Sequence, residues 1–571
     1  MKRPPQPLEL IGAVPDSGES LPAPDTSEGE TRSTVWRRGA EVRYCARTRV
    51  GRFSEALMST VPGDTPTRDQ WGTKLGFILA AMGSAIGLGN IWRYPYVVYD
   101  NGGGAFLIPY FVALATAGLP ILILEYSLGH RFKQGAPATF HTISPRWEWL
   151  GWWQAAVSFV ISTYYVVILG WCLSFIYYSF GQQWGEDTGG FFISEYLATS
   201  AGAEPQGFWD LGGIQWKVLI PMLIAWAMVY VIMQRGVSKG IELASRILMP
   251  TLILMLIIIV VRAITLDGAA AGLDVLFTPD FGALGDPAVW VAAYGQVFFS
   301  LSIAFSIMIA YSSYLPRRTD LSNSALIVGL SNAGFEFLAA IGVFAALGYL
   351  AAVNDVAVTE VVDAGVVLAF VIFPQIISAL PGLNTVFGVL FFGCLFFAGI
   401  TSMVSILECV VAAVREKFDM GRQAAVNWII GICAVISLLY ATQGGLFYLD
   451  TVDHFVNNFG LVIAGLMEVL LVAWIAKELT RQRDHVNDIS FVKMGPWWTI
   501  SLRFITPILL TFMVIYQFVW VELREPYGGY PTSGLLFIGW GAVALTLVLA
   551  LALSLNSRAP QGELVQTGKE E

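Results

Sequence analysis

Twelve apolar runs follow one another from Trp71 onward, and they constrain the fold more than any motif does. Each run is long enough to cross a bilayer, which takes about 20 mostly apolar residues. Only 13% of the residues are charged, against about 25% in soluble domains. The sequence therefore predicts an all-α membrane protein with about twelve transmembrane helices. The runs lie near residues 74–99, 104–129, 152–183, 216–233, 240–264, 288–313, 323–352, 382–413, 424–441, 453–477, 499–521 and 532–556.

Positive charge gathers in alternate loops between these runs. The loops in between are acidic or neutral, as at Glu186 and Asp187. Because basic loops stay on the cytoplasmic side, both termini are predicted to be cytoplasmic, in a multi-pass protein of the plasma membrane. The basic residues that set this orientation include Arg131, Lys133, Arg235, Lys239, Arg317, Arg318, Arg415, Lys417, Lys477 and Arg481.

The first 67 residues differ in composition from the rest of the chain. They are rich in Pro, Gly, Ser, Thr and charge and show no apolar period, which predicts a disordered cytoplasmic segment. An alternative is that translation starts at Met58. The membrane domain is expected at residues 68–557, followed by a cytoplasmic tail at 558–571.

The first run contains a stretch that a simple lipid-spanning helix would avoid. It holds Gly83, Gly87 and Gly89, followed by Asn90 and Arg93. Glycine weakens a helix, and a charge at membrane depth costs at least about 2.5 kcal/mol. We therefore predict a broken helix whose free backbone groups face a cavity.

The sixth run has a similar polar interruption, at Gln296, Ser300, Ser302 and Ser306. A serine in a membrane helix often bonds only to its own backbone, which would account for one or two of these. Interruptions five spans apart are typical of an inverted-repeat transporter. The expected repeats cover about 71–264 and 288–477, with helices 11 and 12 at about 499–556.

Enzyme and metal motifs are missing from the sequence. The five cysteines and four histidines show no metal-ligand spacing, and neither GxSxG nor HExxH occurs. We expect no enzyme activity and no nucleic-acid partner. The expected partners are the lipid bilayer and a small molecule, and the expected state is a monomer or weak dimer.

Several separated motifs carry a family resemblance. WGTKLGFILAAMGSAIGLGNIWRYPY, NGGGAFLIPY, GQVFFSLS and FFAGITS occur in this order between Arg68 and the twelfth run. Together they resemble the neurotransmitter:sodium symporter family, in particular its bacterial amino-acid transporters. The resemblance implies the LeuT fold, with a 5+5 inverted repeat and discontinuous helices 1 and 6.

The resemblance implies two sodium ions as cofactors. All the ligands it points to are neutral oxygens, which suit a monovalent hard cation better than calcium or magnesium. Interhelical hydrogen bonds are the plain alternative for the two asparagines. The first ion would be held by Ala85, Asn90, Ser300 and Asn332 with the substrate carboxylate, and the second by Gly83, Ile86, Ala398, Thr401 and Ser402.

The resemblance also implies where a substrate binds. Amides near Leu88 and Gly89 and the hydroxyl of Tyr165 would bind a carboxylate. Gly87 stands where monoamine carriers of the family have Asp, which favours an α-amino acid. The remaining substrate residues implied are Ala85, Ile161, Phe299, Ser300, Ser302, Phe305, Ser402 and Ile406, whose apolar members would otherwise be read as helix packing.

Two gates follow from the same resemblance. Arg93 and Asp453 match the outer pair, above a lid made by Tyr165 and Phe299. On the cytoplasmic side, the residues implied are Arg68, Trp71, Tyr314 and an acidic residue, either Glu416 or the nearby Asp419.

Glu336 lies in the seventh run, where chloride-dependent relatives have Ser. Its carboxylate, with Tyr110, Gln296 and Ser300 around it, is expected to replace the chloride ion. This predicts chloride independence, with proton antiport through Glu336.

The sequence is thus interpreted as a sodium-coupled symporter that brings a neutral, hydrophobic α-amino acid into the cell by alternating access. Two alternatives stay open. One is a transport-inactive amino-acid sensor of the same fold, and the other is a sodium-coupled osmolyte or amine carrier.

Overall fold

A computed structural model of the chain describes residues 69–199, 208–524 and 526–555. The described residues form helices joined by short loops. They contain two isolated β-bridges and no β-strand. The predicted segment 1–67, its alternative start at Met58, Arg68 and the tail 558–571 lie outside the described residues.

Ten helical segments of the described chain are long and apolar enough to cross a membrane. An eleventh span consists of Lys74–Ala85 and Gly89–Asp100, which are bent by 54° against each other. The sixth predicted span is α13 (Pro287–Ser300) followed by α14 (Ile307–Ser313), with residues 301–306 between them. These segments account for the twelve predicted spans.

The first six spans have the following bounds. Span one is α1 (Lys74–Ala85), α2 (Gly89–Trp92) and α3 (Tyr94–Asp100); span two is η1 (Gly104–Phe106), α4 (Leu107–Ala113), η2 (Leu114–Gly118) and α5 (Leu119–Phe132); span three is α7 (Glu148–Tyr178); span four is α10 (Trp216–Gln234); span five is η5 (Val237–Glu242) and α11 (Leu243–Ile264); span six is α13 and α14.

The last six spans include several π-helical turns. Span seven is α15 (Leu321–Asn354); span eight is α19 (Asn384–Phe418); span nine is α20 (Arg422–Ser437) and η8 (Leu438–Ala441); span ten is α21 (Gly445–Phe455), η9 (Val456–Leu461), α22 (Val462–Leu470) and η10 (Leu471–Ile475); span eleven is α24 (Pro496–Ile500), η11 (Ser501–Ile505), α25 (Thr506–Tyr516) and η12 (Gln517–Glu522); span twelve is α26 (Thr532–Gly534), η14 (Leu535–Trp540) and α27 (Gly541–Ser554).

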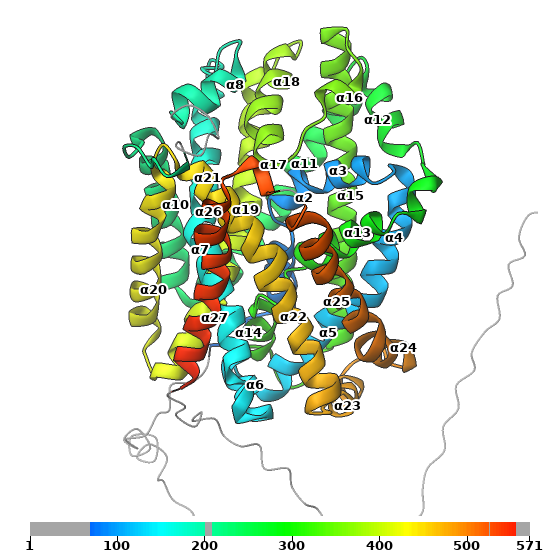
Figure 1. The fold of residues 1–571 in the computed structure, drawn as a ribbon, viewed down its shortest axis with the longest axis vertical. Helices are drawn as coiled ribbons and strands as arrows, with labels where there is room; N and C mark the ends of the chain where they lie inside the picture. Colours follow the sequence, from blue (N-terminus) through cyan, green and yellow to red (C-terminus); the bar gives the residue numbers. More distant parts are fainter. Residues whose placement is uncertain (1–68, 200–207, 525, 556–571) are drawn as a thin grey trace, which may run out of the picture. The chain divides into compact units, whose positions relative to one another are not determined.

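Short helices cover the two ends of the bundle. In Figure 1, α6 and α23 lie at one end, and α8, α12, α16 and α18 lie at the other. Their bounds are α6 (Ala136–Ile143), η3 (Pro145–Trp147), α8 (Thr188–Gly190), η4 (Phe191–Tyr196), α12 (Ala269–Phe277), η6 (Phe281–Gly285), α16 (Val358–Val361), α17 (Gly365–Val367), η7 (Leu368–Ile372), α18 (Phe373–Ala379), α23 (Leu479–Ile489) and η13 (Tyr527–Gly529).

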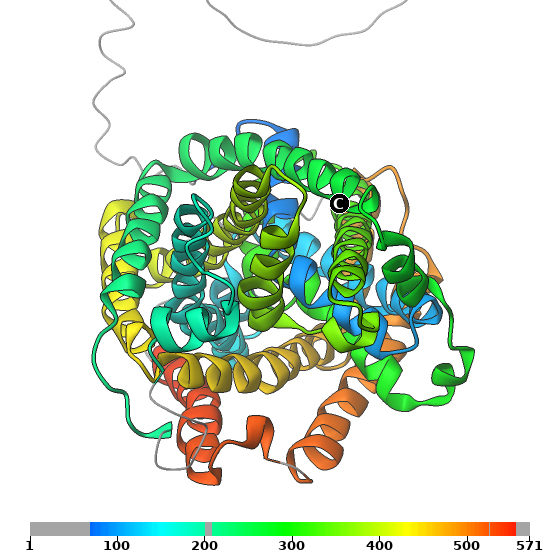
Figure 2. The same ribbon diagram turned by 90° about the horizontal axis from the view of Figure 1, so that it is seen from above.

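The bundle has an inner and an outer set of helices. Within the most apolar window of α19, 83% of residues are buried, whereas the share is 22% for each of the last two spans. Seen from above, α20, α25 and α27 lie on the rim of the bundle (Figure 2). Inner helices can carry polar side chains at membrane depth because those groups face protein instead of lipid.

The first helix breaks between Ala85 and Gly89. Ile86 has an extended conformation at the end of α1 (φ −79°, ψ 93°), and α2 starts three residues later. The predicted break is therefore confirmed.

The break in the sixth span is longer and more strained. Ser302, Ala304 and Ser306 all have positive φ, at 53°, 65° and 66°, and this region costs a non-glycine residue about 1–2 kcal/mol. Side chains of neighbouring helices form hydrogen bonds with backbone groups that the break leaves without a helical partner. Glu125 accepts from the Ala304 amide at 2.7 Å, and Ser158 donates to the Phe305 carbonyl at 2.8 Å.

The two breaks contact each other. The Ser302 hydroxyl donates to the Ser84 carbonyl at 2.9 Å, which joins the unwound part of the sixth span to the end of α1. The 5+5 repeat stays a prediction, whereas the paired breaks that suggested it are present.

Candidate functional site

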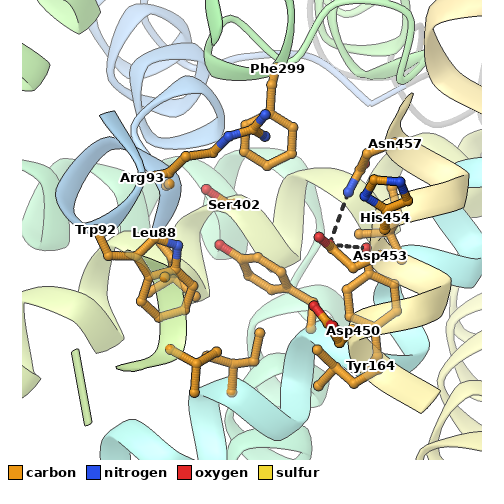
Figure 3. A pocket seen from close by; sticks show the side chains of 18 of the residues that line it. Leu88, Trp92, Arg93, Tyr164, Phe299, Ser402, Asp450, Asp453, His454 and Asn457 are labelled. Carbon is orange, nitrogen blue, oxygen red and sulfur yellow. Dashed lines mark hydrogen bonds between the residues drawn. The ribbon is translucent and has the colours of Figure 1, made fainter. Parts of the chain in front are cut away.

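A cavity of about 570 Å³ lies between the two broken helices, α7 and α19. Its lining includes nearly all of the residues that the sequence analysis assigned to substrate: Ala85, Leu88, Gly89, Ile161, Tyr165, Phe299, Ser302, Phe305, Ser402 and Ile406. Figure 3 shows Leu88, Phe299 and Ser402 around it. The part of the lining formed by Ile161, Phe299, Phe305 and Ile406 is apolar, whereas hydroxyl, amide and charged side chains line other parts of the cavity.

Ser300 is the exception among the predicted substrate residues. It is buried and absent from the cavity lining, and its hydroxyl accepts from Asn332 at 2.5 Å. Its neighbour Phe299 faces the cavity instead, because successive residues of a helix point about 100° apart. Ser300 therefore does not line the cavity in this structure and its contact with substrate stays a prediction, while it lies beside Asn332, another residue of the predicted cation site.

Glycine is needed at two positions of the first break. A Cβ added to Gly87 would lie 3.2 Å from Ser402 Oγ and 3.5 Å from Tyr165 Oη. A Cβ at Gly89 would lie 2.8 Å from the Phe299 ring. The small residues thus leave room beside two hydroxyls and under an aromatic ring.

Three polar side chains from different helices meet behind the first break. Asn90 Nδ2 donates to Asn332 Oδ1 at 2.9 Å and to Ser300 Oγ at 3.3 Å. The Gly87 amide donates to Asn90 Oδ1 at 2.9 Å. Amide and hydroxyl oxygens of this kind suit a sodium ion, so the residues present fit the first predicted cation site.

The second predicted cation site also comes together. Ser402 Oγ lies 3.1 Å from the Gly83 carbonyl oxygen and 3.5 Å from that of Ile86. Thr401 Oγ1 lies 3.0 Å from the Ala398 carbonyl oxygen. The Ser402 hydroxyl of α19 thus lies beside two carbonyl oxygens at the end of α1, and Thr401 and Ala398 add neutral oxygens from the same part of α19. No group of three or more His, Cys, Asp or Glu side chains suited to a metal occurs among the described residues.

Glu336 is fully buried in α15. Tyr110 donates to its Oε2 at 2.5 Å, and Gln296 Nε2 donates to its Oε1 at 2.7 Å. These are two of the three residues that the sequence analysis placed around it. Two hydrogen-bond donors therefore converge on a carboxylate at membrane depth, which is a costly position for an acid without partners.

The cavity continues past the predicted outer gate. Arg93 and Asp453 both line it, yet the ion pairs found within 4.0 Å in the described chain do not join them. The Arg93 guanidinium instead lies 5.3 Å from the centre of the Phe299 ring. The predicted pair is therefore not formed in the structure, and the cavity lining extends past it to Asp450 in α21 and Tyr527 in η13.

Asp453 is held by two residues that the sequence analysis did not assign. Tyr164 donates to its Oδ1 at 2.7 Å, and Asn457 Nδ2 donates to the same oxygen at 2.9 Å (Figure 3). The adjacent residues Tyr164 and Tyr165 could have indicated the Tyr164 contact, because neighbouring residues of a helix face different parts of the structure and only Tyr165 was assigned to substrate.

The opposite end of the cavity is closed by contacts of residues 69–73. The Trp71 indole donates to the Tyr311 carbonyl at 2.8 Å, and the Trp71 amide donates to the Tyr314 carbonyl at 3.3 Å. Asp69 forms ion pairs with Arg415 at 2.7 Å and Arg422 at 3.1 Å.

The Tyr314 side chain contacts Glu408, an acidic residue that the sequence analysis did not assign to the inner gate. The Tyr314 hydroxyl donates to Glu408 Oε1 at 2.9 Å, and Arg422 pairs with Glu408 Oε2 at 2.7 Å. Glu416 accepts from the Gly135 amide at 2.9 Å, and Arg68 lies outside the described residues. The contact of Glu408 could have been predicted from its place within the eighth apolar run, because a carboxylate at membrane depth needs a polar partner.

Comparison with known proteins decides the family. The model of the sodium:neurotransmitter symporter family matches residues 68–189 and 182–561. The chain belongs to this family. It is 41% identical over 489 residues to an uncharacterized sodium-dependent transporter of Methanocaldococcus jannaschii, covering 86% of this chain and 97% of the relative.

Other relatives of the symporter family differ in what they carry. The mouse sodium-dependent neutral amino acid transporter B(0)AT3 is 31% identical over 539 residues, covering 80% of this chain and 86% of its own. The human sodium- and chloride-dependent taurine transporter is 28% identical over 541 residues, which cover 88% of this chain and 86% of the relative. As a member of the symporter family, this protein is a multi-pass, sodium-dependent membrane transporter and not an enzyme.

Proposed function

We propose that this symporter couples sodium entry to the uptake of a neutral α-amino acid with an apolar side chain. Gly87 is the observation that carries the proposal. The space beside it, next to Ser402 Oγ and Tyr165 Oη, is suited to a carboxylate supplied by the substrate. An acidic side chain at this position would occupy that space and repel a carboxylate.

The rest of the cavity supports the choice of side chain. Ile161, Phe299, Phe305 and Ile406 all line it, and an apolar wall of this kind favours an uncharged, hydrophobic group. Amides near Leu88 and Gly89 together with the Tyr165 hydroxyl would bind the carboxylate. Carbonyl groups freed by the break at 301–306 would bind the ammonium group.

Two sodium ions would fit the oxygen sets described above. The set of Ala85, Asn90, Ser300 and Asn332 adjoins the cavity, so a substrate carboxylate would complete the first ion's ligands. A shared contact of this kind makes ion and substrate raise each other's affinity. A sodium ion bound to this set would offset the negative charge of the substrate carboxylate, while residues of the chain would bind and orient the substrate.

Chloride would be unnecessary because Glu336 supplies a fixed negative group. Its contacts with Tyr110 and Gln296 provide donors that an anion would otherwise use. On the return step the carboxylate would take up a proton, so that a proton leaves as sodium and substrate enter.

Orientation follows from the basic loops and the closed end of the cavity. The loop after α5, with Arg131 and Lys133, lies at the same end as the contacts of Trp71. The positive-inside rule assigns that end to the cytoplasm. The open side would then face outward from the plasma membrane, with both termini inside and the protein acting as a monomer or weak dimer.

A ligand panel tests the proposal. Purified protein would be heated with each of the twenty amino acids, taurine and a quaternary amine, in sodium and in potassium, and its unfolding temperature recorded. Stabilisation by apolar neutral amino acids in sodium alone is expected, since a ligand that binds only the native state raises its stability. Sodium-dependent stabilisation by taurine or the amine instead would overturn the substrate class.

The transport-inactive sensor is the second candidate. One human relative, 31% identical over 569 residues, is named an inactive sodium-dependent neutral amino acid transporter. A sensor would bind amino acids in the panel yet move none across a membrane, so uptake into proteoliposomes separates the two.

A further inference from the structure

Glu242 contacts the cytoplasmic end of the first helix from the start of the fifth span. Its side chain belongs to η5 and is 2% exposed. Oε2 accepts from the Gly72 amide at 2.6 Å, and Oε1 accepts from the Thr73 hydroxyl at 2.8 Å. The bond from the Gly72 amide is shorter than an ordinary N–H···O hydrogen bond, and the bond from the Thr73 hydroxyl has the usual O–H···O length.

These bonds attach the carboxylate to the N-terminal end of α1. Thr73 is the N-cap residue of this helix of 12 residues, and its hydroxyl also accepts from the Gly76 amide at 2.9 Å. The N-terminal end of a helix carries partial positive charge, which stabilises a nearby carboxylate. Glu242 thus caps α1 from another span.

Gly76 is required for this contact. A Cβ added there would lie 2.2 Å from Glu242 Oε1 and 2.3 Å from its Cδ. No ordinary side chain at position 76 leaves room for the carboxylate. The helix and the acid are therefore fitted to each other at close range.

α1 separates the cavity from the cytoplasm. Ser84 and Ala85 at its C-terminal end line the cavity, and its N-terminal end lies among the cytoplasmic contacts of Asp69 and Trp71. Access from the cytoplasm requires the N-terminal end of α1 to move away from its neighbours. The bonds to Glu242 would have to break in that movement.

We propose that Glu242 is a positioning residue that latches α1 in the outward-facing state, and that its release from Gly72 and Thr73 is a step of inward opening. This inference rests on the proposed transport cycle and adds a component to it. Asp69 and Trp71 bind the same segment to α14, α19 and α20, whereas its hydrogen bonds to the fifth span, among the described residues, all go to Glu242. A variant without the latch should open inward more readily.

Distance measurements between two spin labels test the latch. Labels would be placed at Lys74→Cys on α1 and Asp484→Cys on α23, both exposed positions. The native cysteines Cys172, Cys394, Cys409 and Cys433 are buried and would be replaced, together with Cys45, in full-length protein. Distances would be recorded in sodium and in potassium.

Wild-type protein should show one main distance in sodium and a second, longer one in potassium. Glu242→Gln loses an acceptor and the charge, so the ratio of long to short distances in sodium should rise about tenfold, as for one lost charged hydrogen bond. Thr73→Val, which removes one donor and keeps the carboxylate, should move the ratio the same way. Thr73→Ser keeps the hydroxyl and should restore the wild-type distances.

Glu148→Gln is the matched control. Glu148 is 5% exposed at the same end of the bundle, and its side chain bonds to His141, Trp152 and Lys417, none of them in α1. This variant should behave as wild type. If wild type responds to the ions but Glu242→Gln and Thr73→Val both keep wild-type distances in sodium, the latch is overturned and the transport cycle stands. If wild type itself shows no response to sodium, both the cycle and the latch are overturned.

Discussion

At the scale of single residues, Gly87 and Glu336 carry the most specific parts of the account. Each stands where a different residue would change what the protein transports or what ion it needs. Both can be tested by one substitution with an isosteric control.

Gly87→Asp should abolish binding of amino acids. The new carboxylate would sit within reach of Ser402 and Tyr165 and repel the substrate carboxylate, and like-charge contacts cost several kcal/mol. We expect at least about a 100-fold loss of affinity for amino acids, measured by binding in sodium. Gly87→Asn has the same shape without the charge and should lose less, and equal losses in the two variants would argue against the electrostatic reason.

Glu336→Ser should make transport depend on chloride. The substitution leaves Tyr110 and Gln296 as donors without the carboxylate they contact, and a chloride ion can take its place. Uptake would be measured with chloride or gluconate as the anion. Glu336→Gln fills the space with a neutral group and should stay insensitive to chloride, whereas chloride-insensitive uptake by Glu336→Ser would refute the substitution idea.

At the scale of helices, the breaks in the first and sixth spans were predictable from glycine, serine and amide residues within apolar runs. The limits of the second break were not, because Ala304 and Phe305 are held by Glu125 and Ser158 of other helices. Contacts far apart in the sequence decide where the helix stops. The amphipathic helix α23 was likewise missed, since its residues are mostly polar and it lies outside the apolar runs.

Ala304 gives a test of the strained break. Its φ of 65° is unfavourable for a β-branched residue, and its side chain is fully buried. Ala304→Val should lower the free energy of unfolding by about 1–3 kcal/mol, measured by thermal unfolding in detergent. Ala304→Gly should be tolerated, because glycine adopts positive φ without strain; equal losses for both would argue for packing alone.

The contact of α23 with α5 predicts a pH effect on stability. His485 Nε2 lies 3.0 Å from His130 Nδ1, and burial, helped by the charges of Arg131 and Lys133, lowers the pKa of His485 to about 4. The unfolded chain has the ordinary histidine pKa of about 6.5. Between pH 4 and pH 6.5 it therefore binds more protons than the native chain does. Stability should therefore be full above pH 6.5 and fall toward pH 4.

The measurement is the unfolding temperature of wild type and His485→Gln between pH 4 and pH 8. Below pH 6.5, the unfolding temperature of the variant should decrease less than that of wild type. A parallel decrease in both proteins would show that His485 plays no part in it.

At the scale of the whole molecule, the apolar runs and charged loops were enough to predict the number of spans, and the motifs were enough to predict which residues meet in the cavity. The direction of individual side chains was not predictable. Ser300 lies beside Asn332 as predicted but does not line the cavity, and Glu408 contacts Tyr314 although no role was assigned to it. Such details depend on how neighbouring helices are rotated, which composition and spacing leave open.

The same holds for the state of the gates. The sequence predicted Arg93 and Asp453 as a pair, while the structure has them apart on an open cavity with the opposite end closed by Asp69 and Trp71. A pair that must open and close is compatible with either arrangement. In the proposed transport cycle the pair would form in some states and separate in others, so one structure shows only one of these arrangements.

Uptake into proteoliposomes tests the central claim most directly. Purified protein would be reconstituted and given a labelled apolar amino acid under an inward sodium gradient, with gluconate as the anion throughout. The account predicts accumulation that requires sodium and is absent when potassium replaces it. Sodium-dependent binding without any accumulation, or accumulation that is the same in potassium, would contradict it.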